Sequence, residues 1–314
     1  MRLDLLAALS GLMIALQARA NGELSYRLNN GIEAALVSFG SGLIIIAVIT
    51  LFHKGIKEGI SNLRVAVKAK EIPRWRLFAG ALGGAFVAVQ TQIVPIIGVA
   101  IYSVASIAGQ TAMSLYVDRI GLTGGGKKLI SRRRIAAAAL TVLAVLVSVW
   151  DRIDAKNLSM WAVFFGVLAG AIVGVQRALN GQINEYSKQS FTTSLLNFMM
   201  GTSFLVILLV IAVIANWSEL APLPAGPWWI YTGGVIGVIY IAFSSTIVQH
   251  LGVFTFTLFS VGGQLVGSLL LDLLLPTSGV NVSAYLVTGI VMTYFGVIAA
   301  GVSSSRIQKS AKEQ

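Results

Sequence analysis

Long apolar runs constrain this chain more than any other feature of its sequence. A transmembrane helix needs about 20 mostly apolar residues, and ten apolar segments follow one another along the chain. They cover residues 4–26, 33–52, 76–96, 98–117, 135–150, 161–184, 191–215, 228–249, 253–275 and 283–302. Only 11% of the residues are charged, against roughly 25% in soluble domains. The sequence therefore predicts an all-α membrane protein with ten transmembrane helices and argues against a soluble enzyme or a nucleic-acid-binding module.

Basic residues between these segments predict how the chain is oriented. Lys and Arg are concentrated in the connections 53–76 and 119–134 and in the C-terminal tail, whereas the connections on the opposite side hold only Arg27, Arg152 and Lys156. Because cytoplasmic loops carry the excess of Lys and Arg, both termini are predicted to be cytoplasmic. The formal net charge of +11 then reflects topology and contact with anionic membrane lipids, and no nucleic-acid partner is expected.

An internal repeat organises the whole sequence. The motif Gly-x5-Gln-x3-Asn-Gly occurs at residues 11–22 and again at 170–181, at an offset of 159 residues. Later matches lie at an offset of 154 and include Trp75/Trp229, Gly80/Gly234, Gly83/Gly237, Gly98/Gly252, Gly109-Gln110/Gly263-Gln264 and Asp118/Asp272. Chance matches between apolar helices would be mainly Leu, Val or Ala, so the polar matches indicate a duplication. We therefore divide the chain into two five-helix repeats, residues 1–156 and 157–314.

An odd number of spans in each repeat predicts that the two repeats are inverted. After five crossings the second repeat enters the membrane in the opposite sense to the first. The charges agree, because the connection 53–75 is rich in Lys and Arg while its counterpart 216–228 has neither. Inverted repeats recur in secondary transporters, where the substrate binds near the midplane between the halves. A passive pore and a non-transporting scaffold are the alternatives left open.

The repeated motif resembles a known family of membrane proteins. Each Gln-x3-Asn-Gly motif is followed about seventeen residues after its Asn by Ser38-Phe39 or Asn197-Phe198, and this pattern resembles the YdcZ-like family of the drug/metabolite transporter superfamily. The resemblance covers essentially residues 4–305 and is that of a two-domain member with both halves fused. It implies the ten-helix drug/metabolite transporter fold in a bacterial inner membrane. It also implies a central cavity lined by spans one to four and six to nine, with spans five and ten at the periphery.

Four amide side chains are the first candidates for a substrate-binding site. Gln17 and Asn21 lie four residues apart, as do Gln176 and Asn180, so each pair shares one helix face. Amides without partners are costly in hydrocarbon, so such residues face a protein interior or a wet cavity. Their positions along the first and sixth spans place the two pairs on either side of the midplane. Hydrogen bonding between helices, without substrate contact, is the alternative.

Two further amides and two arginines complete the candidate set. Gln110 and Gln264 each follow a repeated glycine and are expected near the cavity. Arg19 and Arg177 are the cations inside predicted spans, and an intramembrane Arg is a candidate for recognising an anionic substrate. Structural roles are the alternative. Arg19 precedes Glu23 by four residues, which allows an ion pair along the helix, and Arg177 can extend toward the cytoplasmic headgroups.

The position of the acidic residues bears on the substrate. A proton-coupled exporter of cations commonly uses a buried carboxyl group with a raised pKa. The acidic residues near the spans lie toward span ends, namely Glu23, Glu33, Asp118, Glu185 and Asp272. The sequence therefore favours secondary transport of a small neutral or anionic metabolite by alternating access. Proton-coupled export of cationic drugs or metabolites is the runner-up.

Sequence motifs for catalysis or cofactor binding are not found. The chain has no cysteine, and the glycine-rich stretch before Lys128 lacks the Ser or Thr of a phosphate-binding loop. His53 and His250 lie at span edges away from any acidic cluster. We therefore expect no catalytic residue, no metal ligand, no cofactor and no enzymatic activity. The expected partners are a small-molecule substrate and membrane lipids; a monomer is expected and an oligomer is left open.

Overall fold

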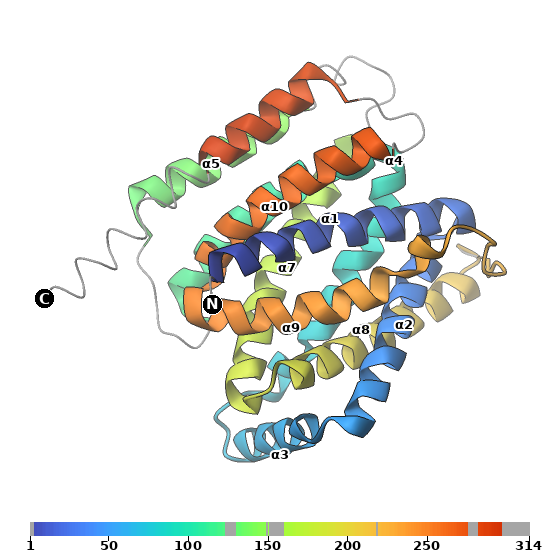
Figure 1. Cartoon of the computed structure of the whole chain (residues 1–314), viewed down its shortest axis with the longest axis vertical. Helices are drawn as coiled ribbons and strands as arrows, with labels where there is room; N and C mark the ends of the chain where they lie inside the picture. Colours follow the sequence, from blue (N-terminus) through green and yellow to red (C-terminus); the bar gives the residue numbers. More distant parts are fainter. Residues whose placement is uncertain are drawn as a thin grey trace, which may run out of the picture.

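The computed structural model describes residues 3–122, 130–148, 150, 160–217, 219–275 and 282–296, and within these ranges the regular secondary structure is helical. Figure 1 shows a bundle of long helices. The elements are α1 (Leu3–Leu28), α2 (Gly31–Phe52), α3 (Lys54–Lys68), η1 (Arg74–Phe78), α4 (Ala79–Ile120), α5 (Arg132–Ser148), α7 (Met160–Ser187), α8 (Ser190–Ile214), η2 (Trp228–Tyr231), α9 (Gly233–Leu251) and α10 (Val253–Leu274). A further apolar helix covers Ala284–Gly296.

Seven helices in the described part of the chain are long and apolar enough to cross a membrane. One of them, Arg74–Ile120, has 47 residues, or roughly 70 Å at 1.5 Å per residue, more than twice the hydrocarbon thickness of about 30 Å. Its helical backbone is interrupted at Gly98, where φ is 81° and ψ is 165°. A backbone of this kind is open to glycine and strained for other residues. The break falls at the first residue of the predicted span 98–117, close to the end of the predicted span 76–96.

The same break occurs at the repeat-equivalent glycine. Gly252 separates α9 from α10 with φ 80° and ψ 162°, within a few degrees of the values at Gly98. In both repeats the helix restarts at the next residue. The two halves of α4 therefore correspond in sequence and in backbone geometry to α9 and α10.

Two shorter apolar helices lie together at one side of the bundle. α5 has 17 residues, and it runs beside the helix Ala284–Gly296 (Figure 1). The helices approach closely because Gly289 faces the backbone carbonyl of Ala144 and Gly296 faces Leu140. This placement agrees with the peripheral positions that the family resemblance implies for the fifth and tenth spans.

The connection 53–76 is not the plain loop that the sequence suggested. It forms the helix α3 and the short 3-10 helix η1. The apolar residues Ile56, Leu63 and Ala66 recur on one face of α3 and are buried, while the lysines at its two ends are exposed. α3 packs against α7 and α8. It was overlooked because its apolar positions are separated by polar ones, so they form no continuous apolar run.

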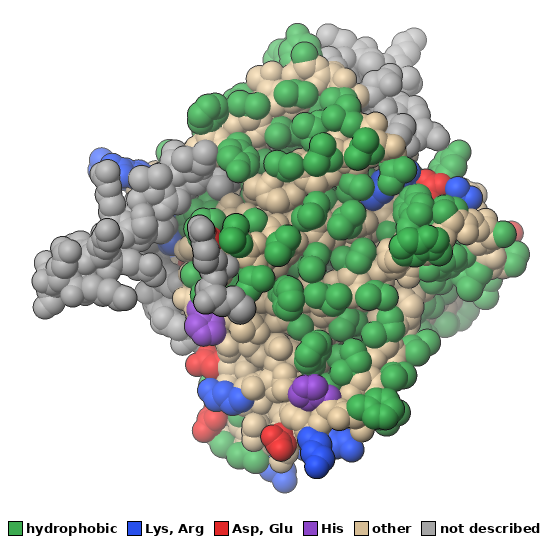
Figure 2. All heavy atoms as spheres, viewed as in Figure 1, with side chains coloured by type: hydrophobic (Ala, Val, Ile, Leu, Met, Phe, Trp, Pro, Cys, Tyr) green, Lys and Arg blue, Asp and Glu red, His purple; other side chains and the backbone are tan. Residues whose placement is uncertain are grey.

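Close helix–helix contacts recur at repeat-equivalent positions. On α1, Gly11 lies against the carbonyl oxygen of Ser260 on α10, and on α7, Gly170 lies against the carbonyl oxygen of Ser106 on α4. These two contacts are related by the sequence offsets of the repeat. Small residues let helix backbones approach in lipid, where no hydrophobic drive holds helices together. The outer surface is rich in apolar side chains, as Figure 2 shows for one face of the molecule.

Candidate functional site

A small cavity lies at the centre of the bundle and is lined by equivalent residues from both repeats. Its volume is ≈ 20 Å³, close to the space that one water molecule needs. The lining pairs are Gln17 with Gln176, Phe39 with Phe198, Gly83 with Gly237, Phe86 with Tyr240 and Val87 with Ile241, and Val173 and Asn197 complete the wall. The cavity therefore has room for about one water molecule, and a metabolite would fit only after the surrounding helices separate.

Gln17 and Asn21 contact the start of α9. The Gln17 side-chain amide donates a hydrogen bond from Nε2 to the Gly233 carbonyl oxygen at 3.0 Å. Asn21 is fully buried. Its side chain and that of Ser38 lie against Gly233, since a Cβ there would overlap the Asn21 Oδ1 atom and approach the Ser38 hydroxyl. Within the described part of the chain, the amide atoms of Asn21 have no hydrogen-bond partner. The pair shares one face, as the four-residue spacing predicted.

Gln176 and Asn180 converge on one acceptor. Gln176 Nε2 donates to Asn197 Oδ1 at 2.9 Å, and Asn180 Nδ2 donates to the same oxygen at 3.3 Å. Asn197 is the repeat equivalent of Ser38, so a shorter side chain occupies this place in the first repeat. The difference leaves the two amide pairs with different partners around the cavity.

Arg177 is buried beside the cavity and does not extend toward headgroups. Its side chain is 2% exposed, and its guanidinium donates to the Tyr240 hydroxyl at 3.0 Å and to Thr257 Oγ1 at 3.1 Å. The Phe256 ring lies under it, 5.1 Å from Cζ to the ring centroid. No described carboxylate forms an ion pair with it, and its Nη2 atom has no partner in the described structure. Because Tyr240 also lines the cavity, its side chain connects this cation to the cavity wall.

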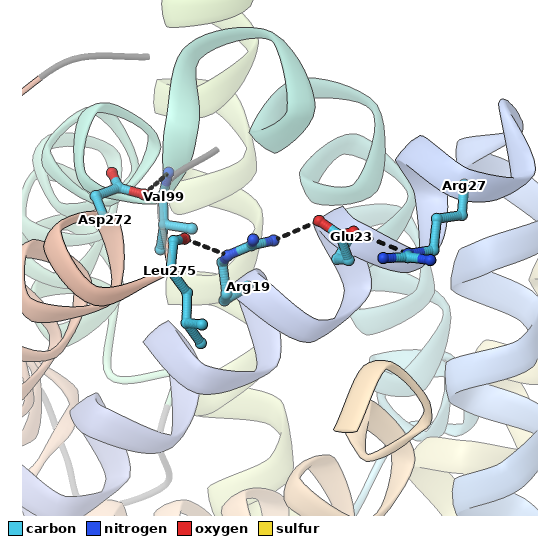
Figure 3. Close-up of polar contacts among 6 residues, drawn as sticks. All are labelled: Arg19, Glu23, Arg27, Val99, Asp272 and Leu275. Carbon is cyan, nitrogen blue, oxygen red and sulfur yellow. Dashed lines mark hydrogen bonds and ion pairs between the residues drawn. The ribbon is translucent and has the colours of Figure 1, made fainter. Parts of the chain in front are cut away.

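Arg19 has a different environment, shown in Figure 3. Its Nε donates to the carbonyl oxygen of Leu275 at the end of α10, at 2.8 Å, and its Nη1 pairs with Glu23 at 3.0 Å. Glu23 also pairs with Arg27 at 2.9 Å. The predicted ion pair along the helix is thus present. Arg19 fastens α1 to the C-terminal end of α10, where unpaired carbonyls favour a cation, and it does not line the central cavity.

Gln110 and Gln264 lie at helix–helix contacts and do not line this cavity. Both side chains are fully buried. Gln110 donates to Ser106 Oγ at 2.9 Å, next to the close approach of α4 and α7, and the Gln264 backbone lies where Gly11 contacts α10. The Gln110 hydrogen bond stays within α4, and in the described structure the side-chain amide atoms of Gln264 have no hydrogen-bond partner.

Acidic groups in the described structure lie away from the cavity lining. Asp272 accepts hydrogen bonds from the backbone amides of Val99 at 3.3 Å and Ala100 at 2.7 Å, where the second half of α4 begins; Figure 3 shows the first of these contacts. Asp118, its repeat equivalent, lies 3.9 Å from the Arg134 guanidinium. Both carboxylates are buried at helix ends, which fits a role in fixing the ends.

Comparison with known families identifies the chain. The model of the family described as "Putative inner membrane exporter, YdcZ" matches residues 3–147 and matches again over residues 161–299. The chain belongs to the YdcZ family. As a member of the YdcZ family it is a membrane transporter, and the family description places such proteins in the inner membrane. The resemblance carried by the paired Gln-x3-Asn-Gly motifs is confirmed.

One solved structure has a similar fold. A crystal structure of another protein superimposes with a TM-score of 0.60 at 14% sequence identity, and the match covers 97% of each chain. At this identity the likeness concerns the fold alone. No curated protein matches the chain.

The cavity includes residues that the sequence did not assign to a site. In the sequence, Phe39 and Phe198 stand out only as part of the motif that resembles the YdcZ-like family, and Tyr240 carries no signal of its own. Asn197 belongs to the same motif, and in the structure it accepts hydrogen bonds from Gln176 and Asn180 on α7. Equivalence at the offset of 154 would have paired Tyr240 with Phe86, but only the packing shows that this pair meets at the centre.

Proposed function

We propose that this protein exports a small anionic or neutral metabolite by alternating access, with its substrate site between two inverted repeats. Export is taken from the family description. In this proposal the repeats are residues 1–156 and 157–314, the chain crosses the membrane ten times, and both termini are cytoplasmic. α4 contributes two crossings that meet at Gly98, and α5 and the helix Ala284–Gly296 contribute one each.

Reciprocal contacts support the inverted arrangement. Equivalent residues of the two repeats form the cavity in pairs, and the α1–α10 contact has its counterpart in the contact of α7 with α4. The two repeats can adopt two different conformations. If they exchange these conformations, the opening of the cavity moves to the other side of the membrane at little net cost in free energy. The conformation with this small cavity is then an intermediate between the two open forms.

One observation carries the substrate class, namely the buried Arg177 guanidinium next to the cavity-lining Tyr240. A cation in a membrane interior is costly and usually pairs with an acid, yet Arg177 is held by two hydroxyls. A carboxylate or phosphate on the substrate would supply the missing charge after rotation of the Tyr240 side chain. This favours an anionic metabolite over a neutral one and disfavours proton-coupled export of cations, since a cation would be repelled.

Flux measurements in proteoliposomes test this proposal. A carrier shows saturable uptake of a radiolabelled anion and faster uptake when unlabelled substrate is present on the far side. A passive pore conducts without saturation or exchange acceleration, and a scaffold shows neither. Purified protein is first screened by thermal unfolding against small carboxylates, phosphates, neutral metabolites and organic cations, because a ligand stabilises the state that it binds. Stabilisation by cations alone would contradict the proposed substrate class.

A further inference from the structure

A second and much larger pocket lies away from the central cavity. Its volume is ≈ 470 Å³, within the roughly 300–1,000 Å³ typical of small-molecule sites. It is bounded by α3, η1 and the first turns of α8. Its walls are mainly apolar and include Leu63, Leu196 and Met199. None of its lining residues is acidic, so the pocket offers an apolar interior without negative charge.

Three cations lie among the lining residues of this pocket. They are Arg64 and Lys68 on α3 and Arg74 at the start of η1. All three are exposed, and none forms an ion pair within the described part of the chain. Figure 2 shows Lys and Arg side chains at the end of the molecule where Figure 1 places α3. A ligand at this pocket therefore meets uncompensated positive charge beside an apolar interior.

The apolar interior continues onto the outer surface of α8. Met199 is 43% exposed at the pocket, and further along the same helix Val206 is 43% and Val210 is 51% exposed. Residues at spacings of seven and four lie on one face of a helix. An acyl chain that begins in the pocket can therefore continue along a mainly apolar face of α8, on which the exposed Ser203 uses its hydroxyl in a hydrogen bond to the Met199 carbonyl oxygen. A free small anion would use the cations but not this apolar path.

We infer that the pocket between α3 and α8 binds an anionic phospholipid, with its phosphate at Arg64, Lys68 and Arg74 and one acyl chain against Leu196 and Met199. Basic clusters beside membrane helices on the cytoplasmic side recognise anionic headgroups in this way. α3 is amphipathic, and its buried face packs on α7 and α8. Bound lipid would hold α3 against α8, and the site is separate from the transport cavity.

Lipid binding to the purified full-length chain tests this inference. Native mass spectrometry in a neutral detergent compares phosphatidylglycerol with phosphatidylcholine of the same acyl chains. We expect one phosphatidylglycerol retained per chain, and weaker binding by about tenfold or more in Arg64→Gln/Lys68→Gln/Arg74→Gln. The matched control Lys54→Gln/Lys57→Gln/Lys70→Gln removes the same charge from exposed residues outside the pocket and should bind as the unmodified chain does.

Two further measurements separate the possible sources of binding. Met199→Trp should block the acyl-chain path and weaken phosphatidylglycerol binding although every cation remains. Glycerol phosphate, which has the anionic group without acyl chains, should not displace the lipid from the unmodified protein. The inference is overturned if both triple variants weaken binding equally, if phosphatidylcholine binds as tightly as phosphatidylglycerol, or if glycerol phosphate competes fully. The last comparison needs no variant and is decisive even if a substituted chain fails to fold.

Discussion

Phe39 and Phe198, which are repeat equivalents, pack against each other at the centre of the molecule with their ring centroids 5.0 Å apart. Each ring also covers the glycine that follows the other by three residues. Phe198 lies over Gly42, and Phe39 lies over Gly201. If the two repeats exchanged places, the same contact would form again. Both rings line the central cavity, so movement of one repeat relative to the other must change this contact.

Substitution of Gly42 tests this packing. A Cβ at Gly42 would overlap the Phe198 ring, so Gly42→Ala should lower the free energy of unfolding by about 1–3 kcal/mol, the usual cost of overpacking. Thermal unfolding in detergent measures the change. Gly40→Ala is the matched control, because no atom lies within 4 Å of a Cβ there, and it should leave stability unchanged or slightly raised. Equal losses in both variants would contradict the contact.

The two cavity glutamines should be needed for transport and not for folding. Gln17→Ala and Gln176→Ala each remove one amide from the cavity wall and one hydrogen bond. We expect each to reduce transport about three- to tenfold, the effect of one modest hydrogen bond, with normal yield of folded protein. Initial uptake rates in proteoliposomes measure this. Gln92→Ala, at an exposed position outside the cavity, serves as the control. Unchanged uptake in both cavity variants would remove the amides from the site.

Substitution of Arg177 should affect transport, whereas substitution of Arg19 should affect stability. Arg177→Gln removes the cation next to Tyr240, so we expect kcat/KM for an anionic substrate to fall roughly 10- to 100-fold, since a hydrogen bond to a charged group is worth about 1.5–3 kcal/mol. Arg177→Lys keeps the charge and should lose less. Arg19→Gln breaks the contacts with Leu275 and Glu23 and should lower the unfolding midpoint while KM stays the same. A loss of stability with unchanged kcat/KM in Arg177→Gln would assign Arg177 a structural role.

Membrane orientation can be measured cleanly because the chain has no cysteine. In the inverted arrangement Lys57 on α3 is cytoplasmic and Glu219 in the connection between α8 and η2 is on the opposite side. Single substitutions Lys57→Cys and Glu219→Cys should therefore react with a membrane-impermeant maleimide from opposite faces of oriented vesicles. Both side chains are exposed, so each is accessible to the reagent. Reaction of the two from the same face would refute the inversion and the alternating-access mechanism with it.

The sequence alone determined the class of the protein, the approximate position of its helices and the repeat. Continuous apolar runs indicate which segments lie in lipid, and paired motifs such as Gln17 with Gln176 indicate a duplication. Neither inference requires knowledge of how the helices pack. The apolar pattern also placed a boundary between two spans beside Gly98, where the structure has a break in the helix. These properties depend only on the order of residues along the chain, so the sequence was sufficient to predict them.

Only the tertiary structure decided which side chains meet. Arg19 and Arg177 were both candidates for binding an anionic substrate. In the structure Arg19 binds the end of α10, whereas Arg177 lies next to the cavity-lining Tyr240. The sequence could not separate them because these partners are more than 60 residues away along the chain. The small cavity lined by Phe39 and Phe198 and the basic pocket beside α3 likewise depend on how closely glycine-containing helices approach. That approach is a sum of many weak packing contacts between distant segments, and no local spacing encodes it.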